Sequence, residues 1–202
     1  GMPVNAERNF KKAIELEGDD KPSLDLLAMT LQQSNRAHEV PALWKEQLDK
    51  QPTSANLLTK YAISLVNAEQ KDAGLAAFEE ALKKADDQVI VKRYFAPLLA
   101  QNGDLDRAMD FYEDCLDVHP NDQAVLIEYA QTLKAANRTV DLQRVLRDIL
   151  ASNPDPNTRA TTLAELIEIE QAKRVESVEQ AKEKMQTGHF DQALQSIRPL
   201  KN

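Results

Sequence analysis

The sequence predicts an all-α fold built from repeated pairs of antiparallel helices, and three observations support this prediction. Ala, Leu, Glu, Gln and Lys, which all favour helices, dominate the 202 residues. Glycine occurs only 5 times, and "QVIV" at 88–91 is the main run of β-branched residues. Large and small apolar residues also recur every 34 positions along the chain. We therefore expect helices throughout and no sheet.

The 34-residue period is carried by three ladders of apolar residues in one frame. The small ladder consists of Ala28, Ala62, Ala96, Ala130 and Ala164. The aliphatic ladder consists of Leu31, Leu65, Leu99, Leu133 and Ile167. The large ladder consists of Phe10, Trp44, Phe78, Tyr112 and Leu146. Three ladders with one step predict a repeated structural unit in which these residues, Trp44 included, are buried.

Each period contains two stretches with helical spacing of apolar residues, as 89–121 illustrates. The first carries Val91 and Phe95 and ends at "NGD", 102–104, where Gly103 suits a left-handed cap at the end of a helix. The second begins at Leu105 and is stopped by Pro120. Pro52 and Pro154 occupy similar places, and "KKADDQ" near Asp86 supplies the turn where a proline is missing. The unit is thus a helix–turn–helix.

This pattern resembles the tetratricopeptide repeat, which reads W-x2-L-G-x2-Y, then A-x3-F, then P. The matching residues in 89–121 are Phe95, Ala96, Leu99, Ala108, Tyr112 and Pro120, and those in 123–156 are Tyr129, Ala130, Leu133, Leu142, Leu146 and Pro154. Alanine replaces the usual first-helix glycine, and Val40, Gly74 and Leu142 replace the usual second-helix alanine. The resemblance covers nearly the whole chain and implies a right-handed superhelical solenoid of antiparallel helix pairs.

In this frame we expect one continuous solenoid domain. Residues 1–20 would be the second helix of a truncated repeat, and full repeats would occupy 21–54, 55–88, 89–122 and 123–156. Residues 157–202 would hold a long helix and a final partial repeat whose signature lies 17 residues out of register. The region 157–187 has no Gly or Pro, which favours one helix over two helices broken near 172–176. We expect a piece of a longer protein of this family; a short natural protein that self-associates through its ends is the alternative.

Composition narrows the classes of partner. The net charge is −8 and the pI is near 5.0, and no basic stripe for nucleic acid is evident. No apolar run approaches the ~18 residues of a membrane span. Gly1 before Met2 indicates a tag remnant. The compartment stays open: cytoplasmic or, if a signal lies outside this sequence, periplasmic.

The sequence offers no convincing catalytic, cofactor or metal site, so we expect a non-enzyme without cofactors. His38, His119 and His189 lie near turns about two repeats apart, and we expect exposed loop histidines rather than ligands. Cys115 occupies a position where the family has a small buried residue, so a core thiol is expected. The adjacent carboxylates at 79–80 and 86–87 are interpreted as solvated surface. Phosphate-loop, dinucleotide and hydrolase motifs do not occur.

The resemblance also implies a concave groove lined by first helices, where this family usually holds an extended peptide or a partner helix. The residues expected to face it lie one turn off the packing ladders: Met29, Lys60, Ile63, Arg93, Tyr94, Pro97, Ile127, Glu128 and Gln131. An apolar strip beside the cations Lys60 and Arg93 indicates a peptide site for an acidic or carboxylate-bearing partner, although these residues could also line the groove without a ligand. Pro97 should bend its helix.

One sub-family is disfavoured. Co-chaperone domains of this kind hold an acidic tail with a clamp of Lys, Asn and Arg side chains. The matching positions here are Asp25, Met29, Lys60, Ile90 and Tyr94, or, one repeat on, Thr59, Ile63, Tyr94, Ala124 and Glu128. Neither set supplies the clamp, so binding of that type is not expected.

The sequence therefore predicts a protein–protein interaction module or scaffold. Two alternatives stay open. One is an architectural spacer or oligomerisation segment that forms a homo-oligomer through open solenoid ends. The other is a non-catalytic arm of a larger secretion or transferase protein.

Overall fold

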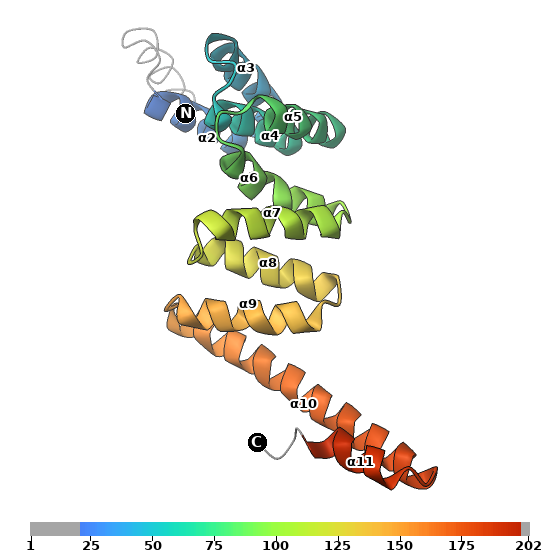
Figure 1. Cartoon of the computed structure of the whole chain (residues 1–202). Helices are drawn as coiled ribbons and strands as arrows, with labels where there is room; N and C mark the ends of the chain where they lie inside the picture. Colours follow the sequence, from blue (N-terminus) through green and yellow to red (C-terminus); the bar gives the residue numbers. More distant parts are fainter. Residues whose placement is uncertain (1–20, 199–202) are drawn as a thin grey trace. The chain divides into compact units, whose positions relative to one another are not determined.

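The computed structural model describes residues 21–198, and these are almost entirely helical, with no strand among them. The predicted all-α fold is therefore confirmed. The chain divides into two compact units, residues 1–118 and 119–202, which we describe separately. Figure 1 shows the helices of both units in sequence colours. The second helix of a truncated repeat, expected in residues 1–20 with Phe10, lies outside the described residues.

The first unit consists of helix pairs. Its elements are α2 (Lys21–Gln33), the short 3₁₀ helix η1 (Ala37–Glu39), α3 (Val40–Lys50), α4 (Ala55–Asn67), α5 (Lys71–Lys84), α6 (Gln88–Gln101) and α7 (Leu105–Val118). Helix α4 packs against α5, and α6 packs against α7. Helix α4 also contacts α6. First helices therefore lie beside first helices, which is the arrangement that a stack of helix pairs requires.

The core of the first unit is formed by the ladders that the sequence defines. Trp44, Phe78 and Tyr112 are buried, which confirms the prediction for Trp44. Phe78 stacks on Phe95 with the ring centroids 4.8 Å apart and an interplanar angle of 6°. The small ladder residues Ala62 and Ala96 are completely buried. Small side chains let neighbouring helices approach, and the large side chains then fill the space between them.

Gly74 marks the closest approach of α5 to α4. A β-carbon at this position would lie 2.5 Å from Val66 Cγ2 and 3.3 Å from the carbonyl oxygen of Ala62. Both neighbouring residues belong to α4. The departure from the usual second-helix alanine therefore has a steric reason in this chain.

The turns inside the helix pairs repeat with the same period as the ladders. Asn35, Glu69, Gly103 and Asn137 all have positive φ, between 57° and 87°, and each lies 34 residues after the one before. The N–H of the next residue donates to the aliphatic ladder residue five positions back, for example Asp104 to Leu99 at 3.0 Å. The same Schellman geometry closes all four turns. The predicted left-handed cap at Gly103 is therefore confirmed.

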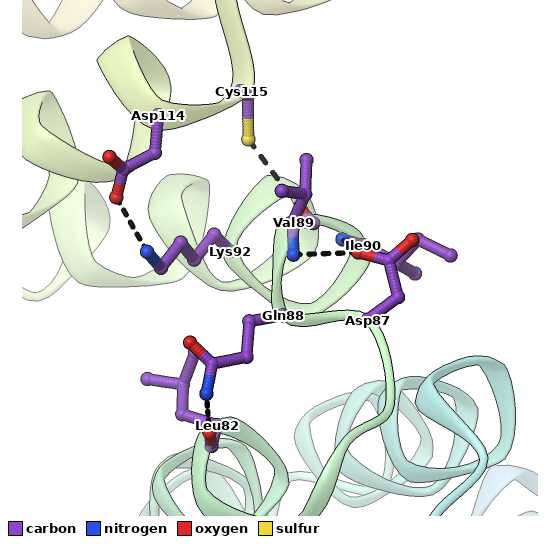
Figure 2. Close-up of polar contacts among 8 residues, drawn as sticks. All are labelled: Leu82, Asp87, Gln88, Val89, Ile90, Lys92, Asp114 and Cys115. Atoms are coloured by element: carbon purple, nitrogen blue, oxygen red, sulfur yellow. Dashed lines mark hydrogen bonds and ion pairs between the residues drawn. The ribbon is translucent and has the colours of Figure 1, made fainter. Parts of the chain in front are cut away.

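Asp86 and Asp87, at the junction between α5 and α6, are exposed, as the sequence predicts, and both side chains also cap helices. The Asp87 side chain caps α6 by accepting from the N–H groups of Val89 and Ile90, as Figure 2 shows. Asp86 accepts from the N–H of Ala55 at 3.1 Å and so caps α4 of the preceding pair. Asp86 Oδ1 is fixed here because a helix start leaves N–H groups without intrahelical partners. These carboxylates tie one repeat to the next.

Glu79 and Glu80 also lie at the surface, as the sequence predicts, and both form ion pairs there. Glu79 pairs with Arg107 at 2.8 Å, which ties α5 to α7 and raises the pKa of Arg107. Glu80 pairs with Lys84 one turn along α5, and this hydrogen bond lowers the pKa of Glu80. Cys115 is buried, as predicted, with its Sγ 3.7 Å from the carbonyl oxygen of Val89 (Figure 2).

The second unit contains α8 (Gln123–Ala135), α9 (Thr139–Ala151), α10 (Pro156–Gln186) and α11 (Phe190–Ile197). Helix α8 packs on α9, α9 packs on the start of α10, and α10 packs on α11. Helix α10 has 31 residues, which is the single-helix alternative of the two that the sequence leaves open (Figure 1). The limits of the individual repeats stay a prediction.

In two of the ladders, the fifth residue is not buried. Ala164 and Ile167 are exposed, whereas Ala130 and Leu133 are buried. The expectation that whole ladders are buried is therefore wrong at these two positions. The reason is the continuation of α10. In the earlier pairs a second helix turns back over the ladder face, but α10 runs on for about five more turns before the chain reverses near Gly188.

Candidate partner-binding face

The residues predicted to line a groove all lie on first helices. Met29 is on α2, Lys60 and Ile63 are on α4, Arg93, Tyr94 and Pro97 are on α6, and Ile127, Glu128 and Gln131 are on α8. The first six belong to one compact unit and the last three to the other. Met29, Tyr94 and Gln131 are exposed, and the other six are half-buried. Their common role in binding stays a prediction.

Tyr94 is the most prominent apolar side chain of α6 at the surface. It is 49% exposed, although its neighbour Phe95 is completely buried in the core. Pro97 lies inside the same helix, which continues to Gln101. Proline has no N–H group, so residue 97 cannot donate to the Arg93 carbonyl oxygen as an ordinary helix residue would. The bend expected at Pro97 stays a prediction.

Lys60 is not an unpaired cation, although the sequence suggests it as one that could bind an acidic partner. Its Nζ lies 2.5 Å from Asp25 Oδ1 and 4.7 Å from the centroid of the Trp44 ring. The ammonium group is thus paired with α2 and positioned over α3. Because Asp25 already offsets this charge, Lys60 is a weak argument for an acidic ligand. Its contacts favour a structural role between the first two helix pairs.

A recess of about 240 Å³ lies within the second unit, between α8, α9 and α10. Its apolar lining comes from Ala130, Leu146 and Ile149, which are buried, and from Ile127. Its polar lining is larger and is contributed by Gln131, Lys134, Thr158, Thr161, Thr162 and Glu165. Two of the nine predicted residues, Ile127 and Gln131, therefore line an actual hollow.

The charged pair at the edge of the recess joins the two first helices. Lys134 Nζ of α8 lies 2.7 Å from Glu165 Oε1 of α10. This contact raises the pKa of Lys134, chiefly through the hydrogen bond from its ammonium group. Lys134 is largely exposed, whereas Glu165 is half-buried. Glu165 therefore offsets the charge of Lys134, and the pair connects α8 to α10 at this edge of the recess.

The threonines of the recess come from the first turns of α10. Asp155 caps this helix by accepting from the N–H groups of Asn157 and Thr158 at 3.0 and 3.2 Å. The hydrogen bond from the Thr158 hydroxyl, followed by these backbone bonds, lowers the pKa of Asp155. Thr162 donates its hydroxyl to the Thr158 carbonyl at 2.7 Å. The hydroxyl oxygen then still has a lone pair that can accept from a ligand.

Sequence reasoning missed the α10 side of the recess, although a signal for it was present. Thr161, Thr162 and Glu165 lie 34 residues after Ile127, Glu128 and Gln131. One more step along the same period therefore identifies them. The predicted set ends at Gln131 because the signature of the final partial repeat lies 17 residues out of register, but the first turns of α10 keep the register of the preceding repeats.

The described residues contain no group of three or more His, Cys, Asp or Glu side chains that could hold a metal ion. His38, His119 and His189 are exposed, as the sequence predicts. Among helices in residues 21–198, none is long and apolar enough to cross a membrane.

Comparison with known proteins identifies the repeat. Residues 99–167 match the family model for the tetratricopeptide repeat. No curated protein matches the sequence. The solved structure of MamA is similar with a TM-score of 0.58 at 14% identity, covering 73% of this chain and 86% of MamA.

Two further solved structures agree. YrrB, described as a TPR protein with an unusual peptide-binding site, has a TM-score of 0.57 at 16% identity, covering 81% of this chain and 83% of YrrB. A human IFIT1 dimer with PPP-AAAA has a TM-score of 0.52 at 16% identity, covering 98% of this chain but only 45% of IFIT1. At these identities the likeness shows the fold. The chain therefore carries tetratricopeptide repeats, matched in sequence over residues 99–167 and shared in fold by the described helices.

Proposed function

We propose that this chain is a non-catalytic interaction module that binds an extended peptide or a partner helix on the faces of its first helices. The observation that supports this most directly is the recess between α8 and α10. It contains Ile127 and Gln131, which the repeat pattern selects without any knowledge of the structure.

The lining of the recess suits a peptide. Leu146 and Ile149 give it an apolar floor, and Gln131 and Thr161 border it with amide and hydroxyl groups. Binding sites for small ligands and peptides commonly combine apolar surface with a few polar groups that fix orientation. A peptide backbone would exchange hydrogen bonds with the polar groups while an apolar side chain enters the hollow.

In the first unit, Tyr94 is the proposed anchor, with Arg93 and Ile63 beside it in the predicted set. Tyrosine and arginine are enriched among the residues that dominate binding energy at protein interfaces. The backbone at Tyr94 is rigid because the next residue, Phe95, is fully buried in the core. Little conformational entropy is therefore lost when Tyr94 binds a partner.

Charge supports a protein partner over a nucleic acid. The net charge of −8 opposes phosphate backbones, and the cations Lys60, Lys92, Arg107 and Lys134 each pair with a carboxylate. The PPP-AAAA in the IFIT1 structure and the peptide-binding site in the YrrB description belong to those proteins. The peptide-binding site of YrrB is the closer precedent for the recess described above.

The test begins with selection of peptides from a displayed random library on the immobilised chain, followed by calorimetric titration of the best peptide. Gln131→Ala with Thr161→Ala removes two exposed side chains at the recess, and Tyr94→Ala removes the proposed anchor. The matched control is Val140→Ala, which deletes an exposed apolar side chain on the second helix α9.

We expect one of the two first-helix variants to weaken binding by about 2 kcal/mol, or roughly thirtyfold, and the control to change nothing. Circular dichroism checks that every variant is folded. A peptide that binds all variants equally, or a library that yields no binder, would contradict the proposal.

A further inference from the structure

One side of the first turns of α10 is apolar and exposed. Ala160, Leu163, Ala164 and Ile167 fall within an arc of about 100° around the helix axis. All four residues are exposed, Leu163 to 44% and Ile167 to 53%. We call these four residues the α10 seat. Glu165, which lines the recess, lies about 160° around the axis from Ile167, so the seat and the recess are on different sides of α10.

The repeat shows what covers this side of a first helix elsewhere in the chain. The residues one and two periods before Leu163, Ala164 and Ile167 are all buried: Tyr129, Ala130 and Leu133 on α8, and Phe95, Ala96 and Leu99 on α6. In those pairs the second helices α9 and α7 pack on the first helices. The α10 seat is therefore a first-helix surface that lacks its second helix.

The residues that follow the seat do not supply this second helix. Each of α5, α7 and α9 carries three buried residues with the same spacing: Gly74, Phe78 and Ala81, then Ala108, Tyr112 and Cys115, then Leu142, Leu146 and Ile149. One more step of the period reaches Glu176, Gln180 and Glu183, which are polar and exposed. They belong to α10 itself, which continues unbroken to Gln186.

The same side of α10 already binds a helix farther along. Ala181 lies about five turns after Leu163 and on the same line of the helix. Helix α11 packs beside the last turns of α10, where Ala181 and Ala193 are both buried (Figure 1). Ile197 follows Ala193 by four positions, so α11 has the small-then-large spacing of α5 and α7. The seat therefore continues an interface that α10 forms with a helix of this kind.

The described helices of a second copy cannot fill the seat without unfolding. Their large residues at the corresponding position are already buried in their own pairs: Trp44 on α3, Phe78 on α5, Tyr112 on α7 and Leu146 on α9. Helix α11 is packed on its own α10. Within residues 21–198, no second helix is therefore left for another copy, and the seat fits a helix that comes from a different protein.

We propose that one amphipathic helix of a different protein docks on the α10 seat and completes the helix pair that this chain leaves open. The docked helix carries a small residue followed by a large apolar residue four positions later, and it runs antiparallel to α10. The small residue would lie against Ala164, as Gly74 lies against the backbone of Ala62, and the large residue would cover the apolar side chains of the seat. This inference does not depend on the recess or on the proposed peptide site.

The probe for the main experiment is a labelled synthetic peptide with the sequence of α5, KDAGLAAFEEALKK, titrated with the full chain and followed by fluorescence anisotropy. It has the required spacing at Gly74 and Phe78, and its three basic and three acidic residues cancel, so the acidic chain does not repel it. The wild-type chain should bind this peptide. A peptide with Phe78→Ala should bind about tenfold more weakly or worse, because most of the apolar area at the contact is lost.

Variants of the chain locate the site. Leu163→Glu and Ile167→Glu each place a carboxylate in the seat and should weaken binding about tenfold or more, because docking would remove that charge from water. The matched control is Val140→Glu, which puts the same charge on an exposed apolar position of α9 and should leave binding unchanged. Circular dichroism verifies that each variant is folded. A wild-type chain that does not bind the peptide at about 1 mM, or equal binding by all three variants, overturns the proposal.

A crosslinking measurement tests the orientation. In a Cys115→Ser background, Gln171→Cys places a thiol about one turn after Ile167. Antiparallel docking predicts a disulfide with a peptide that carries an added cysteine at its N-terminus, and little with one that carries it at its C-terminus. The reverse preference contradicts the proposed geometry.

Sedimentation velocity of the full chain alone tests the other occupant, a second copy. With the seat open to a different protein, Ile167→Glu should leave the sedimentation coefficient of the chain unchanged. Self-association that is abolished both by Ile167→Glu and by Phe10→Ala would assign the seat to residues 1–20 of a second copy and overturn the proposal.

Discussion

The ammonium nitrogen of Lys60 lies 4.7 Å from the centre of the Trp44 indole ring, so a side chain of one repeat covers the largest side chain of the repeat before it. Asp25 holds Lys60 in this position from the other side. A cation over an indole ring is attracted to the ring face. The contact joins three helices, α2, α3 and α4, through three side chains.

Trp44→Ala should lower the free energy of unfolding by about 3–5 kcal/mol, because a buried large side chain is removed and a cavity is left. Lys60→Ala should cost less, about 0.5–1 kcal/mol, since the contact is partly solvated. Chemical denaturation of the wild type and the two variants measures both values. A Trp44→Ala protein with unchanged stability would show that the frame of this repeat is misplaced.

Glu69→Gly should stabilise the chain by about 1 kcal/mol. Glu69 has a φ of +62°, a conformation in which a β-carbon crowds the backbone and glycine does not. The control is Glu69→Ala, which removes the carboxylate but keeps the β-carbon and should bring no such gain. Equal stabilisation by both variants would assign the effect to charge rather than to the backbone. Thermal and urea unfolding distinguish these outcomes.

Gly74→Ala should destabilise the chain by about 1–3 kcal/mol, even though alanine is the better helix former, because the added methyl group overlaps the Val66 side chain. Val66→Ala in the same chain should relieve part of this penalty. A double-mutant cycle on unfolding free energies measures the coupling between the two sites. Purely additive effects would mean that α4 and α5 do not meet at these residues.

Asp155 should make the start of α10 sensitive to acid. Its pKa is lowered in the folded chain, so the ionised cap stabilises the fold above the ordinary pKa of an aspartate, and this contribution is lost as pH falls through the lowered pKa. Asp155→Asn keeps an acceptor at the cap but cannot titrate. The stability difference between wild type and variant should therefore shrink below about pH 4. A difference that is constant from pH 7 to pH 3 would contradict this role.

The helical repeat is predictable from the sequence because its signal is long-ranged and redundant. Ala62, Leu65 and Phe78 belong to three different ladders, and each ladder gives the 34-residue register independently. A substitution in one ladder therefore does not hide the register. The caps at Asp86 and Asp87 are not predictable in this way. Their role depends on which N–H groups two helix starts bring near them, and adjacent carboxylates in a sequence do not indicate that.

The candidate binding face is predictable only in part. Ile127 and Gln131, which the period selects, line the recess, and one more step of the period selects Thr161 and Glu165. It cannot show that Lys60 is already paired with Asp25, because this contact depends on the distance between two side chains 35 positions apart. The position of a residue in the repeat predicts which face of the helix it lies on. The side chains around that residue determine whether it can bind a partner.

The length of α10 has a mechanical consequence. At about 1.5 Å per residue, a helix of 31 residues spans about 46 Å. Its first half is held by α9 as far as Lys173, which donates to Gln143, and its last turns support α11. The part of α10 that follows Lys173 is about 20 Å long, so a tilt of about 10° there would move the far end by about 3 Å.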